Sequence, residues 1–141
     1  MIKKNIGKVN TGTWFLICRF ARGMSCMSRY KYLIKQKADK FQFGLFPNNS
    51  NTQAMILSKE YDTKTEAMES VKRFKLFVSN AVRSGKLDKI VRVYEQNGQY
   101  SFVFDNLQNN ELYKQNKLYI KKASCYKGIK RILENINADI K

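Results

Sequence analysis

The residues of this sequence that are best suited to binding chemistry are cations interleaved with aromatic side chains. On an exposed surface, tyrosine rings stack on nucleic-acid bases while lysine and arginine contact the phosphates. The competing interpretation is that the tyrosines are half-buried and the lysine stems lie over them. The sequence favours this second interpretation, because no RNP-like consensus accompanies the two groups. Their members are Arg29, Tyr30, Lys31 and Tyr32 near the start of the patterned sequence, and Tyr126, Lys127, Lys130 and Arg131 near its end.

The remaining chemical groups argue against an enzyme. The sequence contains no histidine, which removes the commonest general base, the Ser-His and Cys-His pairs and histidine metal sites. It also has no glycine-rich phosphate-binding motif. Its densest acidic group precedes and opens a predicted helix, where carboxylates are expected to stabilise the helix rather than bind a metal. We therefore expect a non-enzymatic protein with no catalytic residue, metal or cofactor. The acidic group consists of Glu60, Asp62, Glu66 and Glu69.

The three cysteines are scattered along the chain. Cys18, Cys26 and Cys125 form no CxxC pair, and an odd, scattered set is typical of reduced thiols in the cytoplasm rather than of a disulfide framework. Cys125 falls on the apolar stripe of a predicted helix, where a small buried hydrophobic residue is expected rather than a nucleophile.

The sequence is strongly basic. Its 27 lysines and arginines exceed its 11 acidic residues by 16 charges, and such a field attracts nucleic acid, anionic lipid or acidic proteins. The cations are spread along the whole chain, however. An abundance of Lys, Asn and Ile is also what an AT-rich genome produces without selection for binding. The sequence therefore favours a solvated basic surface, with a nucleic-acid face as the alternative.

Residues 1–27 have no counterpart elsewhere in the chain. Lysines precede a short apolar run, but Arg19 and Arg22 interrupt this run before it reaches the length of a signal-peptide core. No span approaches the roughly 20 apolar residues of a transmembrane helix. We expect a non-repeat leader that is disordered or was wrongly included, with Met24 or Met27 as the real start. Anchoring of this segment to a membrane surface is a further alternative.

An internal duplication organises the rest of the sequence. The stretch 30–78 reappears at 91–136, with most large apolar positions in phase. Phe41, Phe43 and Leu45 align with Tyr100, Phe102 and Phe104, an alternation that places one face of a strand on a core. Copies of about 50 residues would be marginal alone, so we expect one shared core. The later aligned pairs are Tyr61 with Tyr119, Ala67 with Cys125, Val71 with Ile129, Phe74 with Ile132 and Val78 with Ile136.

Each copy is predicted to form three strands followed by a helix. In the first copy the turn Ala38-Asp39-Lys40 separates two strands, and a capping box at Thr63–Glu66 starts the helix. In the second, Asn97-Gly98 is a strong hairpin signal. The predicted strands cover 30–35, 41–46, 53–58, 89–95, 100–104 and 111–115, and the helices begin near 63 and 123. The fold class is α+β: two tandem β-β-β-α repeats that share one antiparallel sheet, with two helices packed on one face.

Several of these motifs occur in the same order in both copies. They are Phe41-Gln42-Phe43-Gly44-Leu45, Ser58-Lys59-Glu60-Tyr61, Thr63-Lys64 with Ala67, and Ser70-Val71-Lys72, then Asn97-Gly98-Gln99-Tyr100-Ser101-Phe102, Tyr119 and Gly128-Ile129-Lys130. In this pattern the chain resembles the YegP-like family of small, mostly bacterial proteins of unknown function. The resemblance implies a first repeat at 28–86 and a second at 87–141, and it leaves open an exchange of terminal strands between them. Asp39, Asn116 and Lys121-Lys122 depart from the family pattern.

The resemblance implies no activity, so the expected function rests on the fold. We expect a cytoplasmic bacterial domain that acts as an interaction or self-association module, with an unknown protein partner or a homodimer, because exposed strands can pair between chains. The alternative is weak, salt-sensitive RNA or DNA binding through a basic-aromatic sheet face.

Overall fold

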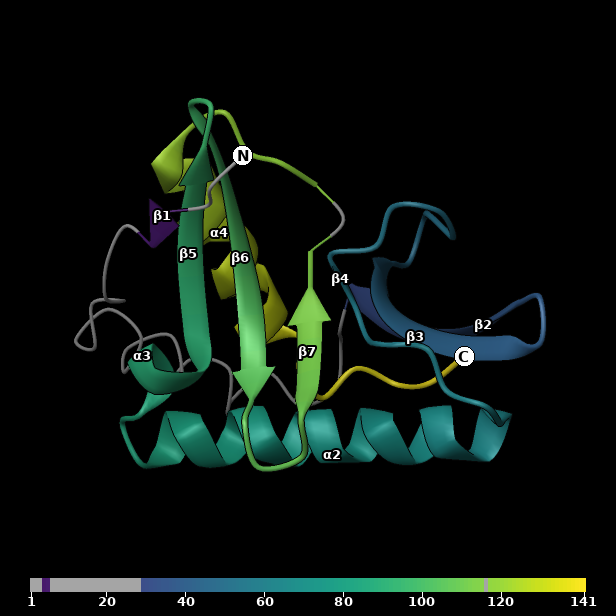
Figure 1. Ribbon diagram of the computed structural model, residues 1–141. Helices are drawn as coiled ribbons and strands as arrows, with labels where there is room; N and C mark the ends of the chain where they lie inside the picture. Colours follow the sequence, from purple (N-terminus) through teal and green to yellow (C-terminus); the bar gives the residue numbers. More distant parts are fainter. Residues whose placement is uncertain (1–3, 6–28, 116) are drawn as a thin grey trace.

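The computed structural model describes residues 4–5, 29–115 and 117–141. Apart from Lys4 and Asn5, the predicted leader, with Cys18 and Cys26, lies outside the described residues. The chain forms an α+β fold around one antiparallel sheet, whose strand order is β1-β5-β6-β7-β4-β3-β2 (Figure 1). This confirms the predicted α+β class and the single antiparallel sheet, whereas the division into two tandem repeats stays a prediction. No helix within the described ranges is long and apolar enough to cross a membrane.

The bounds of the elements follow the predicted pattern with local differences. The described strands are β1 (Lys4–Asn5), β2 (Tyr30–Lys37), β3 (Lys40–Pro47), β4 (Ile56–Leu57), β5 (Val91–Gln96), β6 (Gln99–Asn106) and β7 (Glu111–Lys114). The described helices are α2 (Lys64–Arg83), α3 (Leu87–Ile90) and α4 (Lys122–Glu134). The strand expected from Lys89 begins at Val91, because the preceding residues form the short helix α3. The third strand expected at 53–58 is reduced to the two residues of β4.

Local sequence signals account for the ends of several elements. The Thr63 side chain accepts a hydrogen bond from the Glu66 N–H, which confirms the predicted N-cap of α2. Asn97 and Gly98 both have positive φ, as a two-residue type I′ turn requires. In the β2–β3 turn the positive φ falls on Ala38 rather than on Asp39. Asp39 is therefore not at the position where glycine would relieve strain.

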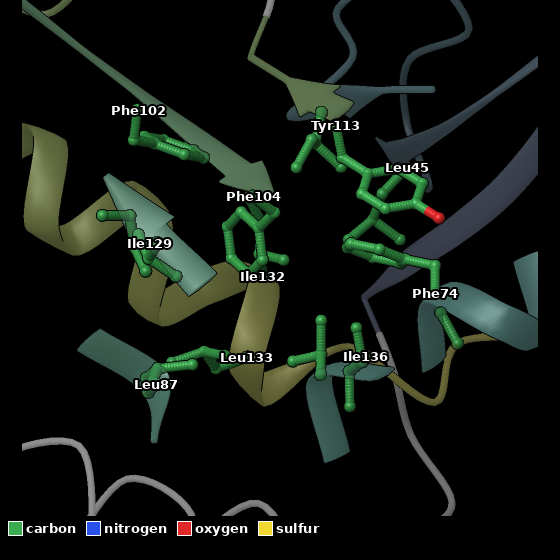
Figure 2. Close-up of a cluster of buried hydrophobic side chains, with 14 of the residues drawn as sticks. Leu45, Phe74, Leu87, Phe102, Phe104, Tyr113, Ile129, Ile132, Leu133 and Ile136 are labelled. Carbon is green, nitrogen blue, oxygen red and sulfur yellow. The ribbon is translucent and has the colours of Figure 1, made fainter. Parts of the chain in front are cut away.

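Both long helices bury their apolar stripes against the sheet in a single cluster. Phe74 of α2 contacts the rings of Phe43, Phe104 and Tyr113 from strands on both sides of the β4–β7 junction. Ile129 and Ile132 of α4 lie beside Phe102 and Phe104 in the same cluster (Figure 2). Every residue of the two predicted helical stripes is buried. The structure thus confirms the core positions predicted from the helical spacing.

Residues near the two ends of the described chain pair at opposite edges of the sheet. β1 pairs with β5 at one edge. At the other edge the Tyr32 N–H donates to the Asp139 carbonyl, and the Lys141 N–H donates to the Tyr32 carbonyl. The residues after α4 therefore close onto β2, and Figure 1 shows the C-terminus beside β2 and β3. Both edges of the sheet are therefore held by contacts between residues that are far apart in the sequence.

Candidate functional site

The first predicted binding group, Arg29 to Tyr32, divides between the surface and the core. Arg29 is exposed and Tyr30 is half-buried. Tyr32, in contrast, has no exposed surface, and its hydroxyl donates a 2.7 Å hydrogen bond to the Ile136 carbonyl. Tyr32 is therefore covered rather than available for stacking, and more deeply buried than the half-buried position that the sequence favoured, because strand alternation turns its ring toward Phe43 and Phe74.

Lys31 is engaged within the protein. Its Nζ atom donates to the Asn51 side-chain oxygen at 2.6 Å and to the Asn48 carbonyl at 3.2 Å. Lys35 donates to the Asn51 carbonyl and lies over the Phe46 ring. The two ammonium groups thus hold the loop between β3 and β4 against the sheet. A phosphate would have to compete with these carbonyl and amide oxygens for Lys31.

The second predicted binding group lies on α4, and most of it is exposed. Lys127, Lys130 and Arg131 are exposed, and Tyr126 is half-buried. Burial raises the pKa of Tyr126, and the Lys122 Nζ atom lies 6.0 Å from its ring centre. Lys130 approaches Glu134 at 3.9 Å, one helical turn further on. This group therefore presents cations to solvent, with a partly covered aromatic ring among them.

Tyr30 of the first predicted group and Arg131 of the second both act on the Tyr119 hydroxyl. Burial raises the pKa of Tyr119 first, Tyr30 adds to this rise, and Arg131 opposes it. The Tyr119 ring packs against α4, where it lies beside Gly128. The structure therefore places one residue of each predicted group close enough to Tyr119 to influence its hydroxyl.

A run of exposed cations extends the second predicted group toward the N-terminus, from α4 back to β7. Lys114, Lys117, Lys121 and Lys122 are all exposed. Between them Leu118 and Ile120 are 51% and 79% exposed. The first turn of α4 has no side-chain cap, since the N-cap residue is Lys121. We call the exposed residues of 112–115 and 117–133 the β7–α4 surface. Its signal in the sequence is the absence of any acidic residue from this stretch.

A feature that the sequence did not predict is a buried ionic network across the β4–β7 junction. Glu111 of β7 is 1% exposed. Its carboxylate accepts hydrogen bonds from the Ser70 hydroxyl at 3.0 Å, from the Tyr61 hydroxyl, and from Arg73 Nε and Nη2 at 3.1 and 3.2 Å. No local pattern could reveal this network, because its members come from distant segments of the chain.

The electrostatics of this network follow from burial and hydrogen bonding. Burial by itself raises the pKa of Glu111, but the hydrogen bonds from Arg73, Tyr61 and Ser70 outweigh it and hold the pKa below its usual range. Burial, followed by the bond to Glu111, raises the pKa of Tyr61 to about 12. The Tyr113 hydroxyl is also buried and has no hydrogen-bond partner among the described residues. The network thus keeps one ionised carboxylate inside the fold.

The acidic group and the described cysteine have the structural surroundings that the sequence predicted. Glu60, Asp62, Glu66 and Glu69 are exposed at and just inside the start of α2. Asp62 pairs with Lys40, whose hydrogen bond lowers the pKa of the carboxyl. Cys125 is fully buried, and burial raises the pKa of its thiol to about 12. Its position in the core is therefore confirmed.

A comparison of the chain with protein-family models, curated proteins and solved structures finds no match. The resemblance to the YegP-like family therefore stays a prediction. The function must be argued from the surfaces and contacts of this chain alone.

Proposed function

We propose that this protein binds single-stranded nucleic acid weakly and in a salt-sensitive manner, through the β7–α4 surface. The proposal treats the two halves of the chain, 28–86 and 87–141, as copies of one β-β-β-α unit. Two matched backbone contacts support this correspondence. Phe41 of β3 bridges to Tyr61 before α2, and Tyr100 of β6 bridges to Tyr119 before α4.

The observation that carries the proposal is that charge is distributed unequally between the two copies. Residues 112–133 contain seven lysines and arginines and no acidic residue. The aligned residues 54–75 contain five lysines and arginines and four acidic residues. A genome that favours lysine codons would raise the charge of both copies alike. The excess in the second copy alone supports a specific role for this surface.

The cations of the β7–α4 surface are also available to an external anion. Among the described residues, Lys130 is the one member of this set with an acidic partner, Glu134. Lys117 and Lys122 lie over the rings of Tyr119 and Tyr126, where an ammonium keeps most of its hydrogen-bonding capacity. Phosphate groups that displace counterions from these lysines would produce binding that weakens steeply with salt.

The test is fluorescence anisotropy of the full chain with labelled single-stranded RNA and duplex DNA, across a salt series. Replacing Lys117, Lys122 and Lys127 by Gln should weaken binding and lower the slope of log K against log salt by about 2, since each lost phosphate contact on a single strand contributes ~0.7. All three residues are exposed, so the fold should be retained.

The first half provides a control of equal charge. Lys59, Lys64 and Lys72 are exposed in the first copy, and their replacement by Gln removes the same three charges. The proposal requires this control to bind nearly as well as the unmodified chain. Equal weakening in both triple variants would show that net charge alone attracts the nucleic acid, and no binding at low salt would refute the proposal altogether.

Self-association through a sheet edge, the first expectation from the sequence, has less support. β2 lies at one end of the sheet, where residues 139–141 already hydrogen-bond to Tyr32, and it carries Lys31, Lys35 and Lys37. Lysines on an edge strand oppose pairing with a second strand, because the two like-charged edges repel each other. A homodimer, an unidentified protein partner and a cytoplasmic location therefore stay predictions. The proposed function involves no catalytic step, in keeping with the absence of histidine from the sequence.

A further inference from the structure

A small hollow lies on the β7–α4 surface, against strand β6. Its volume is about 210 Å³, and its walls include Ser101 and Val103 of β6 together with Lys114, Gln115, Lys117 and Leu118. Pockets for drug-sized molecules occupy roughly 300–1,000 Å³. The size of this hollow therefore suits one small planar group rather than a large cofactor.

The hollow combines apolar walls with cations. Val103 is half-buried, and Leu118 has 51% of its surface exposed, so each offers aliphatic surface to a flat ligand. The exposed lysines Lys114 and Lys117 stand in the same lining. A hollow with apolar walls and ammonium groups at its border matches a nucleotide, because the base is flat and the phosphate is anionic.

Gln115 supplies an unsatisfied hydrogen-bond acceptor in this lining. Its Nε2 atom donates to the Tyr100 carbonyl at 3.4 Å, which identifies the other end of the amide as the oxygen. This Oε1 atom is buried and has no hydrogen-bond partner within the described part of the chain. A buried acceptor left without a donor is unfavourable, because it has lost its hydrogen bonds to water. The hydrogen bond that holds the amide is long, and the terminal torsion of glutamine is soft. The amide can therefore turn toward a ligand that brings a donor.

We propose that this hollow is a subsite for one unstacked nucleobase that carries an exocyclic amino group. The inference rests on the proposed function and deepens it. The base lies against Val103 and Leu118, its amino group donates to Gln115 Oε1, and the adjacent phosphates contact Lys114 and Lys117. Adenine, cytosine and guanine carry such an amino group, whereas uracil does not. Single-stranded nucleic acid with these bases is thus the preferred ligand.

The test compares three labelled oligomers with the same number of phosphates: oligocytidine, oligouridine and an abasic strand. Anisotropy with the full chain at fixed salt should give the tightest binding for oligocytidine, by roughly 3- to 10-fold over the other two, which is the range expected for one net hydrogen bond. Gln115→Met keeps the length of the side chain and removes the acceptor. It should abolish the preference for cytosine while leaving the affinity for the abasic strand unchanged.

Two further variants test whether the effect is specific to this hollow. Leu118→Ala reduces the apolar wall at an exposed position and should weaken oligocytidine binding more than abasic binding. Gln53→Met, at an exposed position in the first half, should change neither. Equal affinity for all three oligomers would overturn the base subsite and leave the proposed phosphate-binding function standing. Oligouridine that binds as tightly as oligocytidine would also overturn it, and no binding to any strand would refute both proposals.

Discussion

Replacement of Arg73 by Met should destabilise the fold and change how its stability responds to acid. Arg73 donates two hydrogen bonds to the carboxylate of Glu111, whose side chain is 2% exposed. Removing one partner of a fully buried ion pair costs about 3–5 kcal/mol. Because 41% of the Arg73 side chain is exposed, water already screens this pair in part. We therefore expect the free energy of unfolding to fall by about 2–3 kcal/mol at neutral pH.

The pH dependence follows from the direction of the Glu111 pKa. In the unmodified protein this pKa lies below its usual range, so the folded state binds fewer protons than the unfolded state. The stabilisation is fully present above the ordinary Glu pKa of about 4.3 and is lost as the pH falls through the lowered value. Without Arg73, only the hydrogen bonds from Tyr61 and Ser70 oppose the effect of burial, so the pKa of Glu111 should rise relative to that in the unmodified protein. The variant should then gain stability relative to the unmodified protein as the pH falls from 7 toward 4.5.

The assay is urea denaturation followed by circular dichroism at several pH values. Arg131 is a matched control, because it aligns with Arg73 in the second copy and is exposed. Arg131→Met should change the free energy of unfolding by no more than about 0.5 kcal/mol. In the double variant Arg73→Met with Glu111→Gln, part of the loss should be recovered, with a coupling energy of about 1–3 kcal/mol. Additive losses, or an unchanged pH slope in Arg73→Met, would refute an ionised Glu111 held by Arg73.

Two other predictions concern α4. Gly128→Ala should lower the free energy of unfolding by about 1–3 kcal/mol, because a Cβ atom there would lie 2.9 Å from Cζ of the buried Tyr119 ring; a thermal melt equal to that of the unmodified protein would show that this ring moves aside easily. Cys125 should react with a thiol reagent at pH 8 only after denaturation, since burial raises the pKa of its thiol to about 12. A chain in which Cys18 and Cys26 are replaced by Ser isolates this reaction, and rapid labelling of the native protein would contradict the buried position.

Much of the fold was predictable because it depends on short-range patterns. The alternation of Phe41, Phe43 and Leu45 defines which side chains of a strand share a face, and the helical spacing of Val71 and Phe74 defines the buried stripe. Thr63 and the Asn97-Gly98 pair act through hydrogen bonds and φ angles within a few residues. These are the features that the structure reproduces most closely.

The candidate site was less predictable. Period-two alternation shows that Tyr30 and Tyr32 share a face, but it does not show which face of a strand becomes wet or how deeply each ring is buried. Tyr32 is fully buried because α2 and the residues after α4 cover it. In the same way, the engagement of Lys31 by the loop at Asn48–Asn51 depends on how that loop folds back. Exposure depends on how the elements pack together, so the sequence of a single strand does not determine it.

The sequence by itself determined the strands, the helix stripes, the turns and the acid-free stretch from 112 to 133, since each depends on residues that are close together in the chain. The tertiary structure decided which charges are buried and which remain free. Glu111 meets Arg73 across 38 positions and Tyr61 across 50, and the hollow beside Gln115 exists only where β6 lies against the segment that follows β7. The physical reason is that burial and ion pairing depend on distances in space, which a linear pattern of residue types does not specify.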